Sequence, residues 1–437
     1  MEPEVVGLVA MLAVVILLTL RVNVGVALGL PSLLGIALIV GDLEAGALQA
    51  TSTVFQVFSR EGFVVIPLFI AMGTLAYEFG LANDIFGMMA RWVAPLRGGL
   101  AMATAVACGL FAGITGSSVA TIATMARTAL PEMLKAGYSP RLAAATVAAS
   151  GSIGILIPPS TILVLYGLLA EQSIGKMLLA GVVPGILSVA IDVSLIALLV
   201  HMRPESAPGR KHYPLRERIE WTMRGWTVIL VFGIVVGGIY SGIWLPTEAA
   251  AAGVVAVILA GLVRRSVTLS SLWYGLREAV GIAASIGLVI AGAFLLTRLL
   301  ALTGLTGEIL VFLGAVDVPP IVVLLMFIAM FAVLGMFLEG TTILALTIPI
   351  ALPIMIHLGY DPIWFGVIMV KSVELALYTP PVGLNVYTLV ATYPSIPVGT
   401  VFRGVIPFAI AEFFTMGVLI AFPWIVTWLP SVAYGSP

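Results

Sequence analysis

Apolar residues form long runs, separated by short polar stretches, along almost the whole chain. A helix needs about 20 apolar residues to cross the hydrocarbon core of a bilayer. Runs near that length cover residues 5–20, 22–40, 64–80, 177–200, 226–243, 249–262, 282–300 and 405–428. Two further stretches, 42–60 and 264–278, mix polar and apolar residues and predict amphipathic helices along the membrane interface. The pattern predicts an all-α polytopic membrane protein.

Composition supports this class. Hydrophobic residues make up 61% of the chain and charged residues 9%, whereas soluble domains carry about 25% charged residues. The single cysteine, Cys108, excludes an intramolecular disulfide framework, and the net charge of -1 gives no indication of nucleic-acid binding. Glu2 and Glu4 stand where a signal peptide would be basic, so we expect the first run to be retained as part of a helical hairpin.

Basic residues predict the orientation, because loops rich in Lys and Arg stay in the cytoplasm. Residues 201–224 carry Arg203, Arg210, Lys211, Arg216, Arg218 and Arg224, so we expect this linker to be cytoplasmic. With five crossings before it, the N-terminus lies on the opposite side.

The chain repeats itself at an offset of 222 residues. The matches are Gly113 with Gly335, Pro131 with Pro353, Gly137-Tyr138 with Gly359-Tyr360, Pro140 with Pro362, and Pro158-Pro159 with Pro380-Pro381. Residues 1–200 then form the first repeat, 201–224 the linker and 225–437 the second repeat. An odd number of crossings in each half places the second copy in the membrane upside down, as in the inverted repeats of secondary transporters.

Each half contains two interruptions in apolar sequence. Residues 113–118 and 335–342 split apolar stretches too short for two crossings, which predicts two re-entrant hairpins with half-length arms. Proline pairs near 158–160 and 379–385 remove backbone donors inside apolar helices and predict two broken helices. A proline pair alone is often only a kink. A hairpin tip and a helix break occur together in each half, at the same offset of 222 residues. This recurrence favours a cation site in each half, because the carbonyls of unwound backbone can bind a cation.

Several motifs resemble the large membrane subunit of TRAP (tripartite ATP-independent periplasmic) transporters. They are GITGSSVATIA, PEMLKAGYSP, GILIPPS, AGVVPG, LPTEAAAA, GYDPIWFGVI and TPPVGLN. The resemblance implies an elevator-type transporter of the bacterial inner membrane, with a periplasmic N-terminus. It also implies sodium-coupled import of a small organic acid anion. The implied partners are a periplasmic substrate-binding protein and a small four-helix membrane subunit.

The same resemblance implies two sodium sites, and the offset of 222 relates one to the other. The first comprises Thr115, Ser117, Gly154, Ile157 and Pro159; the second comprises Phe337, Glu339, Ala376, Thr379 and Pro381. Phe337 and Ala376 can offer only carbonyls. Glu339 replaces the Ser117 hydroxyl with a carboxylate, which either binds the ion or pairs with a neighbour.

Short polar positions between the two tips are substrate candidates. They are Gly116, Ser118, Ser160, Arg298, Gly340, Thr341 and Asn385. Asn385 either contacts substrate or caps the helix after the second break. Arg298 either clamps a carboxylate or extends to the membrane interface. Lys371 and Glu374, three residues apart, predict an internal ion pair, with substrate contact as the alternative.

Other functions fit less well. An intramembrane hydrolase would need a base for Ser117 or Ser118, and no histidine falls within an apolar run. No Gly-rich loop ends in Lys-Ser or Lys-Thr, so we expect no ATP hydrolysis. Broken helices in inverted halves favour alternating access over a passive channel. A stand-alone anion transporter of the wider elevator group, working without a binding protein, remains an alternative.

Overall fold

The computed structural model describes residues 2–208, 212–315 and 318–435, and the regular elements in these ranges are helices. The first half contains α1 (Pro3–Thr19), α2 (Val24–Val40), α3 (Leu43–Phe58), η1 (Glu61–Val64), α4 (Val65–Glu78), α5 (Leu81–Val93), α6 (Gly99–Thr115), α7 (Ser118–Lys135), α8 (Pro140–Ser150), η2 (Ile153–Ile155), α9 (Thr161–Leu169) and α10 (Ile174–Met202). After η3 (Pro204–Ser206), the second half contains α11 (Leu215–Tyr240), α12 (Pro246–Val263), α13 (Leu269–Thr303), α14 (Leu305–Ala315), α15 (Pro320–Phe337), α16 (Gly340–His357), α17 (Pro362–Ala376), α18 (Leu384–Thr392), α19 (Val398–Ala421) and α20 (Trp424–Tyr434).

The helices repeat at the offset found in the sequence. Shifting α7 by 222 residues gives 340–357, the bounds of α16, and shifting α2 gives 246–262, one residue short of α12. Packing between the halves is reciprocal: α2 packs on α13 while α12 packs on α4, and α9 packs on α16 while α18 packs on α7. Reciprocal contacts of this kind are what two inverted copies produce. The predicted all-α fold with inverted repeats is confirmed, while the residue boundaries of the three domains stay a prediction.

Eight helices among the described residues are long and apolar enough to span a membrane, but they are not the eight predicted runs. Six coincide. The runs at 5–20 and 22–40 form α1 and α2, which are only 17 residues each because the chain turns between them. The hairpin arms α15 and α16 qualify instead, with 18 residues each.

The two predicted amphipathic segments differ. Residues 43–58 form the separate helix α3, whereas residues 269–280 continue into the 35-residue helix α13. In the first half the sequence Ser59-Arg60-Glu61-Gly62 interrupts the helix. The equivalent residues 281–284 read Gly-Ile-Ala-Ala and leave the helix intact. The second segment is therefore helical from Leu269 onward and continuous with the spanning helix, and its place at the membrane interface stays a prediction.

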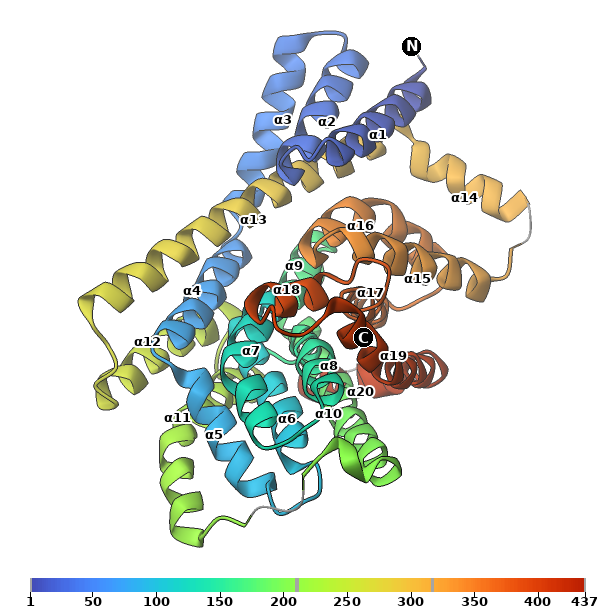
Figure 1. The fold of residues 1–437 in the computed structure, drawn as a ribbon. Helices are drawn as coiled ribbons and strands as arrows, with labels where there is room; N and C mark the ends of the chain where they lie inside the picture. Colours follow the sequence, from blue (N-terminus) through green and yellow to red (C-terminus); the bar gives the residue numbers. More distant parts are fainter. Residues whose placement is uncertain (1, 209–211, 316–317, 436–437) are drawn as a thin grey trace.

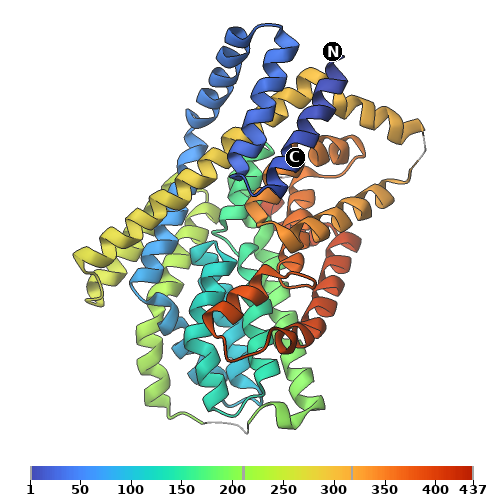
Figure 2. The ribbon, with the colours of Figure 1, turned by 45° about the horizontal axis from the view of Figure 1, so that its top comes forward.

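The N-terminus and the α2–α3 connection lie at the opposite end of the molecule from the connection between α10 and α11 (Figures 1 and 2). Basic residues gather at the α10–α11 end. Arg91 forms an ion pair with Glu217 at 3.4 Å and lies 4.0 Å from the ring centre of Trp221. Arg264 pairs with Asp84. Acidic side chains therefore balance these two arginines, and the orientation in the membrane stays a prediction.

Glycines bring α2 and α13 into close contact. A Cβ atom on Gly292 would lie 2.6 Å from the Gly25 carbonyl oxygen and 2.9 Å from the Leu28 Cβ. Small residues at helix crossings allow such approach within membranes. A larger residue would have to push two backbones apart.

We therefore expect Gly292→Ala to destabilise the protein by about 1–3 kcal/mol, the usual cost of overpacking. The measurement is the melting temperature of detergent-purified protein, which should fall. Gly237→Ala on α11 is the matched control, because a Cβ there meets no atom within 4 Å. Equal melting temperatures for the two variants would contradict the close α2–α13 contact.

Candidate functional site

Two helical hairpins are present, and each turns within the interval that the sequence predicts. The first turns at residues 116–117, between α6 and α7, and Gly116 adopts a φ of 62°. The second turns at residues 338–339, between α15 and α16. The arms have 17 and 18 residues in the first hairpin, about 26 Å each. They are longer than the predicted half-length arms because α7 continues past the apolar stretch through Pro131, Glu132 and Lys135.

Both predicted helix breaks are present. Between α8 and α9 the α-helix is interrupted over residues 151–160, and between α17 and α18 over residues 377–383. The first interruption begins seven residues ahead of its proline pair, earlier than predicted. Pro158 and Pro159 lack the N–H groups that would satisfy carbonyls one turn earlier, so the chain leaves the α-helix upstream of them.

The first tip packs against the first break. A Cβ atom on Gly113 would lie 3.3 Å from the Pro158 carbonyl oxygen and 3.4 Å from the Ile157 carbonyl oxygen. A Cβ on Gly154 would overlap Ala112 on α6. At the tip, the Thr115 hydroxyl lies 3.2 Å from the Thr121 hydroxyl. Hydroxyl and carbonyl oxygens are therefore gathered between the tip and the break.

The second tip has an equivalent environment with different chemistry. A Cβ on Gly335 would lie 2.5 Å from the Ala376 Cβ at the end of α17. The Thr379 hydroxyl donates to the Ala376 carbonyl at 3.3 Å. Glu339, the residue before α16, is exposed into the space beside the tip, and Phe337 is also exposed. A carboxylate thus stands where the first tip has a serine hydroxyl.

Both tips open onto one cavity of about 840 Å³. The first tip contributes Thr115 to Ser118, and the second contributes Glu339, Thr341 and Thr342. The opposite wall comes from α4 and α13, which supply Thr74, Tyr77, Glu278 and Ser285. The two carboxylates of this lining are Glu278 and Glu339, and none of its residues is Lys or Arg.

The structure brings together some predicted substrate residues. Gly116, Ser118 and Thr341 line the cavity, and buried Gly340 lies at the second tip. Ser160 is fully buried; its hydroxyl donates to the Ile155 carbonyl and accepts from the Leu163 N–H at 3.2 Å, as the N-cap of α9.

Two further substrate candidates lie outside the cavity. With the Gln49 amide oriented to accept, Arg298 donates to it from Nε at 3.1 Å and Nη2 at 2.6 Å. Arg298 therefore contacts helix α3 and is not part of the cavity lining. Asn385 is fully buried, and within the described parts of the chain neither its amide oxygen nor its amide nitrogen has a hydrogen-bond partner. Its side chain therefore does not cap α18.

The predicted sodium residues offer a donor set suited to a hard cation. The carbonyls of Ile157 and Pro158 lie beside Gly113 at the first tip, and the hydroxyl-bearing residues Thr115 and Ser117 line the cavity there. Unwound carbonyls in broken membrane helices are typical sodium ligands. In the parts of the chain that the structure describes, no three His, Cys, Asp or Glu side chains are placed to hold a metal ion together. The hydroxyl and carbonyl oxygens at the first tip and break fit a sodium ion, and the two sodium sites stay a prediction.

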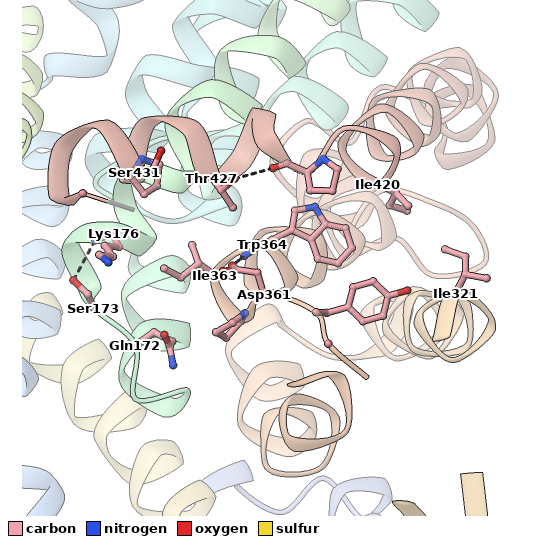
Figure 3. Close-up of a pocket in the computed structure, with 16 residues that line it drawn as sticks. Gln172, Ser173, Lys176, Ile321, Asp361, Ile363, Trp364, Ile420, Thr427 and Ser431 are labelled. Atoms are coloured by element: carbon pink, nitrogen blue, oxygen red, sulfur yellow. Dashed lines mark hydrogen bonds between the residues drawn. The ribbon is translucent and has the colours of Figure 1, made fainter. Parts of the chain in front are cut away.

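A second cavity of about 860 Å³ lies on different elements (Figure 3). Its wall includes Ser173 and Lys176 at the start of α10, Asp361 and Trp364 at the start of α17, and Thr427 on α20. Asp361 caps α17 by accepting from the Trp364 N–H at 2.7 Å. None of the predicted site residues lines this cavity.

Sequence reasoning missed part of a buried charged cluster. The predicted ion pair between Lys371 and Glu374 is confirmed, with 3.1 Å between Nζ and Oε2 and both side chains buried. Lys371 also pairs with Glu412 on α19, and Asp192 on α10 lies nearby. Glu412 is the one charged residue of the apolar run 405–428, and Asp192 is the one charged residue of the run 177–200. That position marks each as unusual, yet it does not name a partner.

Comparison with known proteins decides the family. Residues 10–425 match the family model "Tripartite ATP-independent periplasmic transporter, DctM component". The chain belongs to this family. It is 34% identical to the C4-dicarboxylate TRAP transporter large permease protein DctM of Pseudomonas aeruginosa, over 88% of both chains.

Other TRAP permeases are similar as well. The Ectoine/5-hydroxyectoine large permease UehC of Ruegeria pomeroyi is 29% identical, with 97% of this chain and 99% of the relative covered. The sialic acid permease SiaT of Haemophilus influenzae is 28% identical over 97% of this chain and 68% of its own length. The YdaH transporter of Alcanivorax borkumensis has a similar fold, with a TM-score of 0.66, 16% identity, and coverage of 87% of this chain and 90% of that one. The chain is thus a TRAP transporter large permease and a multi-pass membrane protein.

The tip cavity should be open to water, because several of its lining residues are exposed. We expect Thr341→Cys to react with a water-soluble maleimide in the purified protein. The native Cys108 is fully buried and gives little background. Thr347→Cys, on the same helix but buried outside the cavity, is the control and should stay unlabelled. Labelling is measured by mass spectrometry, and an unreactive Thr341→Cys in folded protein would contradict an open cavity.

Proposed function

We propose that this TRAP permease imports a small organic acid anion by sodium-coupled, elevator-type alternating access. The observation that carries the proposal is the single cavity onto which both hairpin tips open. One wall belongs to the tips and the other to α4 and α13. A substrate in that space would contact both halves of the repeat, and a shift of the tips along α4 and α13 would carry it across the membrane.

The charge of the cavity supports a role for sodium in substrate binding. Its lining contains Glu278 and Glu339 but no Lys or Arg. An anion there needs positive charge from another source. Sodium ions at the two tips, together with the N-terminal ends of α7 and α16, would supply it. Relatives named for C4-dicarboxylate and sialic acid support an organic acid as substrate.

The proposed ion ligands come from tip and break in each half. In the first, the hydroxyls of Thr115 and Ser117 would bind sodium together with carbonyls around Ile157 and Pro159. In the second, Glu339 and Thr379 would take the equivalent roles, with carbonyls near Ala376 and Pro381. Binding an ion at either place would hold the tip against the break and so shape the cavity wall for substrate.

The tripartite description of the family supports two partners. We propose a periplasmic substrate-binding protein that delivers the anion and a small four-helix membrane subunit that accompanies the permease. The basic end of the molecule, with Arg91 and the segment before α11, would face the cytoplasm of a bacterial cell. The N-terminus would then lie on the periplasmic side of the inner membrane.

Uptake into proteoliposomes tests this function. The vesicles contain the permease, a small membrane subunit and a binding protein, and receive labelled dicarboxylates, sugar acids, keto acids or sialic acid. We expect saturable uptake that requires an inward sodium gradient. Ser117→Ala or Thr379→Ala should raise the half-saturating sodium concentration about tenfold, since losing one ligand worth about 1.4 kcal/mol has that effect.

Ser194→Ala is the matched control, because its exposed hydroxyl only bonds back to Ala190 on the same helix. It should leave sodium dependence unchanged. Flux that does not saturate and ignores the gradient would overturn the carrier proposal. Full uptake without the binding protein would instead favour a stand-alone anion transporter.

Glu339→Gln separates charge from shape at the second tip. Because Gln keeps the size but loses the negative charge, we expect weaker sodium binding, with the half-saturating sodium concentration raised by about tenfold or more. Thr342→Ser, another cavity residue of the same tip, keeps its hydroxyl and should change little. Sodium dependence is read from initial uptake rates, and an unchanged Glu339→Gln would show that this carboxylate is not a sodium ligand.

A further inference from the structure

The second cavity lies where three helices that can span the membrane have their ends. Lys176 is in the first turn of α10, Ile321 in the first turn of α15 and Ile420 in the last turn of α19, and all three line the cavity. Each of these helices is long and apolar enough to cross a bilayer. The ends of spanning helices lie where the hydrocarbon core meets the headgroups. The cavity therefore lies at that boundary.

Helix α20 forms part of the cavity wall and lies at the same depth. Its 11 residues are too few to span a membrane, and it packs on α10 and α17. Thr427 and Ser431 line the cavity, while Trp424 and Trp428 are exposed. Tryptophan is enriched at the level of the headgroups. A short surface helix with two exposed tryptophans is typical of a segment along the membrane interface.

Two side chains of opposite charge belong to the cavity wall. They are Lys176 and Asp361, the charged members of its described lining. Within residues 2–208, 212–315 and 318–435, neither of them forms an ion pair. Asp361 Oδ1 accepts from the Trp364 N–H at 2.7 Å, which fixes the exposed carboxylate at the start of α17. The cavity thus offers a ligand both a cation and an anion.

The charged and apolar parts of the cavity wall lie apart. Lys176 is on one side, Ile321 and Ile420 are on the other, and Trp364 lies between them (Figure 3). Trp364 is buried, and its Nε1 donates to the Leu419 carbonyl at 3.0 Å, which fixes the ring. A ligand that fills this space needs a polar end and an apolar end.

The apolar side continues onto exposed helix faces. Leu325 lies one turn beyond Ile321 on α15, and Phe413 lies two turns before Ile420 on α19; both are exposed. Residues at these spacings share one face of a helix. Apolar chains that leave the cavity beside Ile321 and Ile420 would therefore remain in contact with apolar side chains.

A phospholipid with an amine in its headgroup has the matching chemistry. Its phosphate is an acceptor for a lysine ammonium, and its own ammonium is a donor to a carboxylate. Basic pockets between membrane helices bind headgroups in this way. The volume of about 860 Å³ is within the range of about 300–1,000 Å³ that is usual for binding pockets.

We propose that the second cavity binds the headgroup of a membrane phospholipid that carries an amine, such as phosphatidylethanolamine. The phosphate pairs with Lys176, the ammonium pairs with Asp361, and the acyl chains leave beside Ile321 and Ile420. No lining residue is shared with the tip cavity. The lipid site is therefore separate from the cavity proposed for the transported anion.

Native mass spectrometry of the purified, delipidated full-length protein tests the proposal. Phosphatidylethanolamine and phosphatidylglycerol with the same acyl chains are titrated separately. The wild type should bind phosphatidylethanolamine about tenfold more tightly, because phosphatidylglycerol has no ammonium for Asp361. Lys176→Gln should weaken the binding of both lipids about tenfold. Asp361→Asn, which still caps α17, should remove the preference for phosphatidylethanolamine.

Two variants outside the cavity are matched controls. Lys135→Gln removes an exposed lysine at the end of α7. Asp42→Asn changes the exposed residue that caps α3, as Asp361 caps α17. Neither should alter the affinity for either lipid. Unchanged binding in both Lys176→Gln and Asp361→Asn would overturn the proposal.

Two measurements on the wild type do not depend on variant folding. Phosphatidylethanolamine with a photoreactive group near the start of an acyl chain should label α15 and α19 close to Ile321 and Ile420, and the labelling should saturate. Glycerophosphoethanolamine, the soluble headgroup, should not displace the lipid at equal concentration. Equal affinity for the two lipids, or saturable labelling confined to other helices, would contradict the site. Displacement by the soluble headgroup would assign the cavity to a soluble zwitterion and overturn the lipid.

Discussion

Backbone groups that are not helical inside a hydrocarbon layer must form their hydrogen bonds within the protein. The arrangement of the hairpins and broken helices in this permease follows from that requirement. Two hairpin tips and two helix breaks each expose carbonyl and N–H groups. The first tip is sheltered by the first break, with Gly113 against the Ile157 and Pro158 carbonyls. Helices from the other half complete the enclosure, since α16 packs on α9 and α18 packs on α7. The inverted repeat therefore supplies both the irregular segments and the helices of the other half that pack beside them.

The two copies have kept this backbone arrangement while their side chains have diverged. The positions of α7 and α16 agree to the residue, yet Ser117 in one turn corresponds to Glu339 in the other. Both turns face the same cavity. Equivalent backbone positions at the two tips thus differ in charge, so the two sodium sites proposed above would have unequal affinities.

Sequence predicted the repeat, the tips and the breaks because each depends on residues close together in the chain. Gly and Pro act on their own backbone, so their effect can be read locally. Contacts between distant helices could not be read in this way. Arg298 was placed near substrate on charge alone, but the rotation of α13 directs it toward Gln49 on α3. Glu412 and Asp192 meet Lys371 only because α10, α17 and α19 converge.

The converging helices also explain why the charged cluster belongs to both halves. Helices α10 and α19 correspond across the repeat, and Glu412 minus 222 gives position 190, two residues from Asp192. Helices α10 and α19 thus each contribute one acidic residue at a similar position along the helix, and α17 of the second copy adds Lys371 and Glu374. The contacts of Lys371 with Glu374 and Glu412 place opposite charges together, which lowers the cost of burying each of them inside a membrane protein.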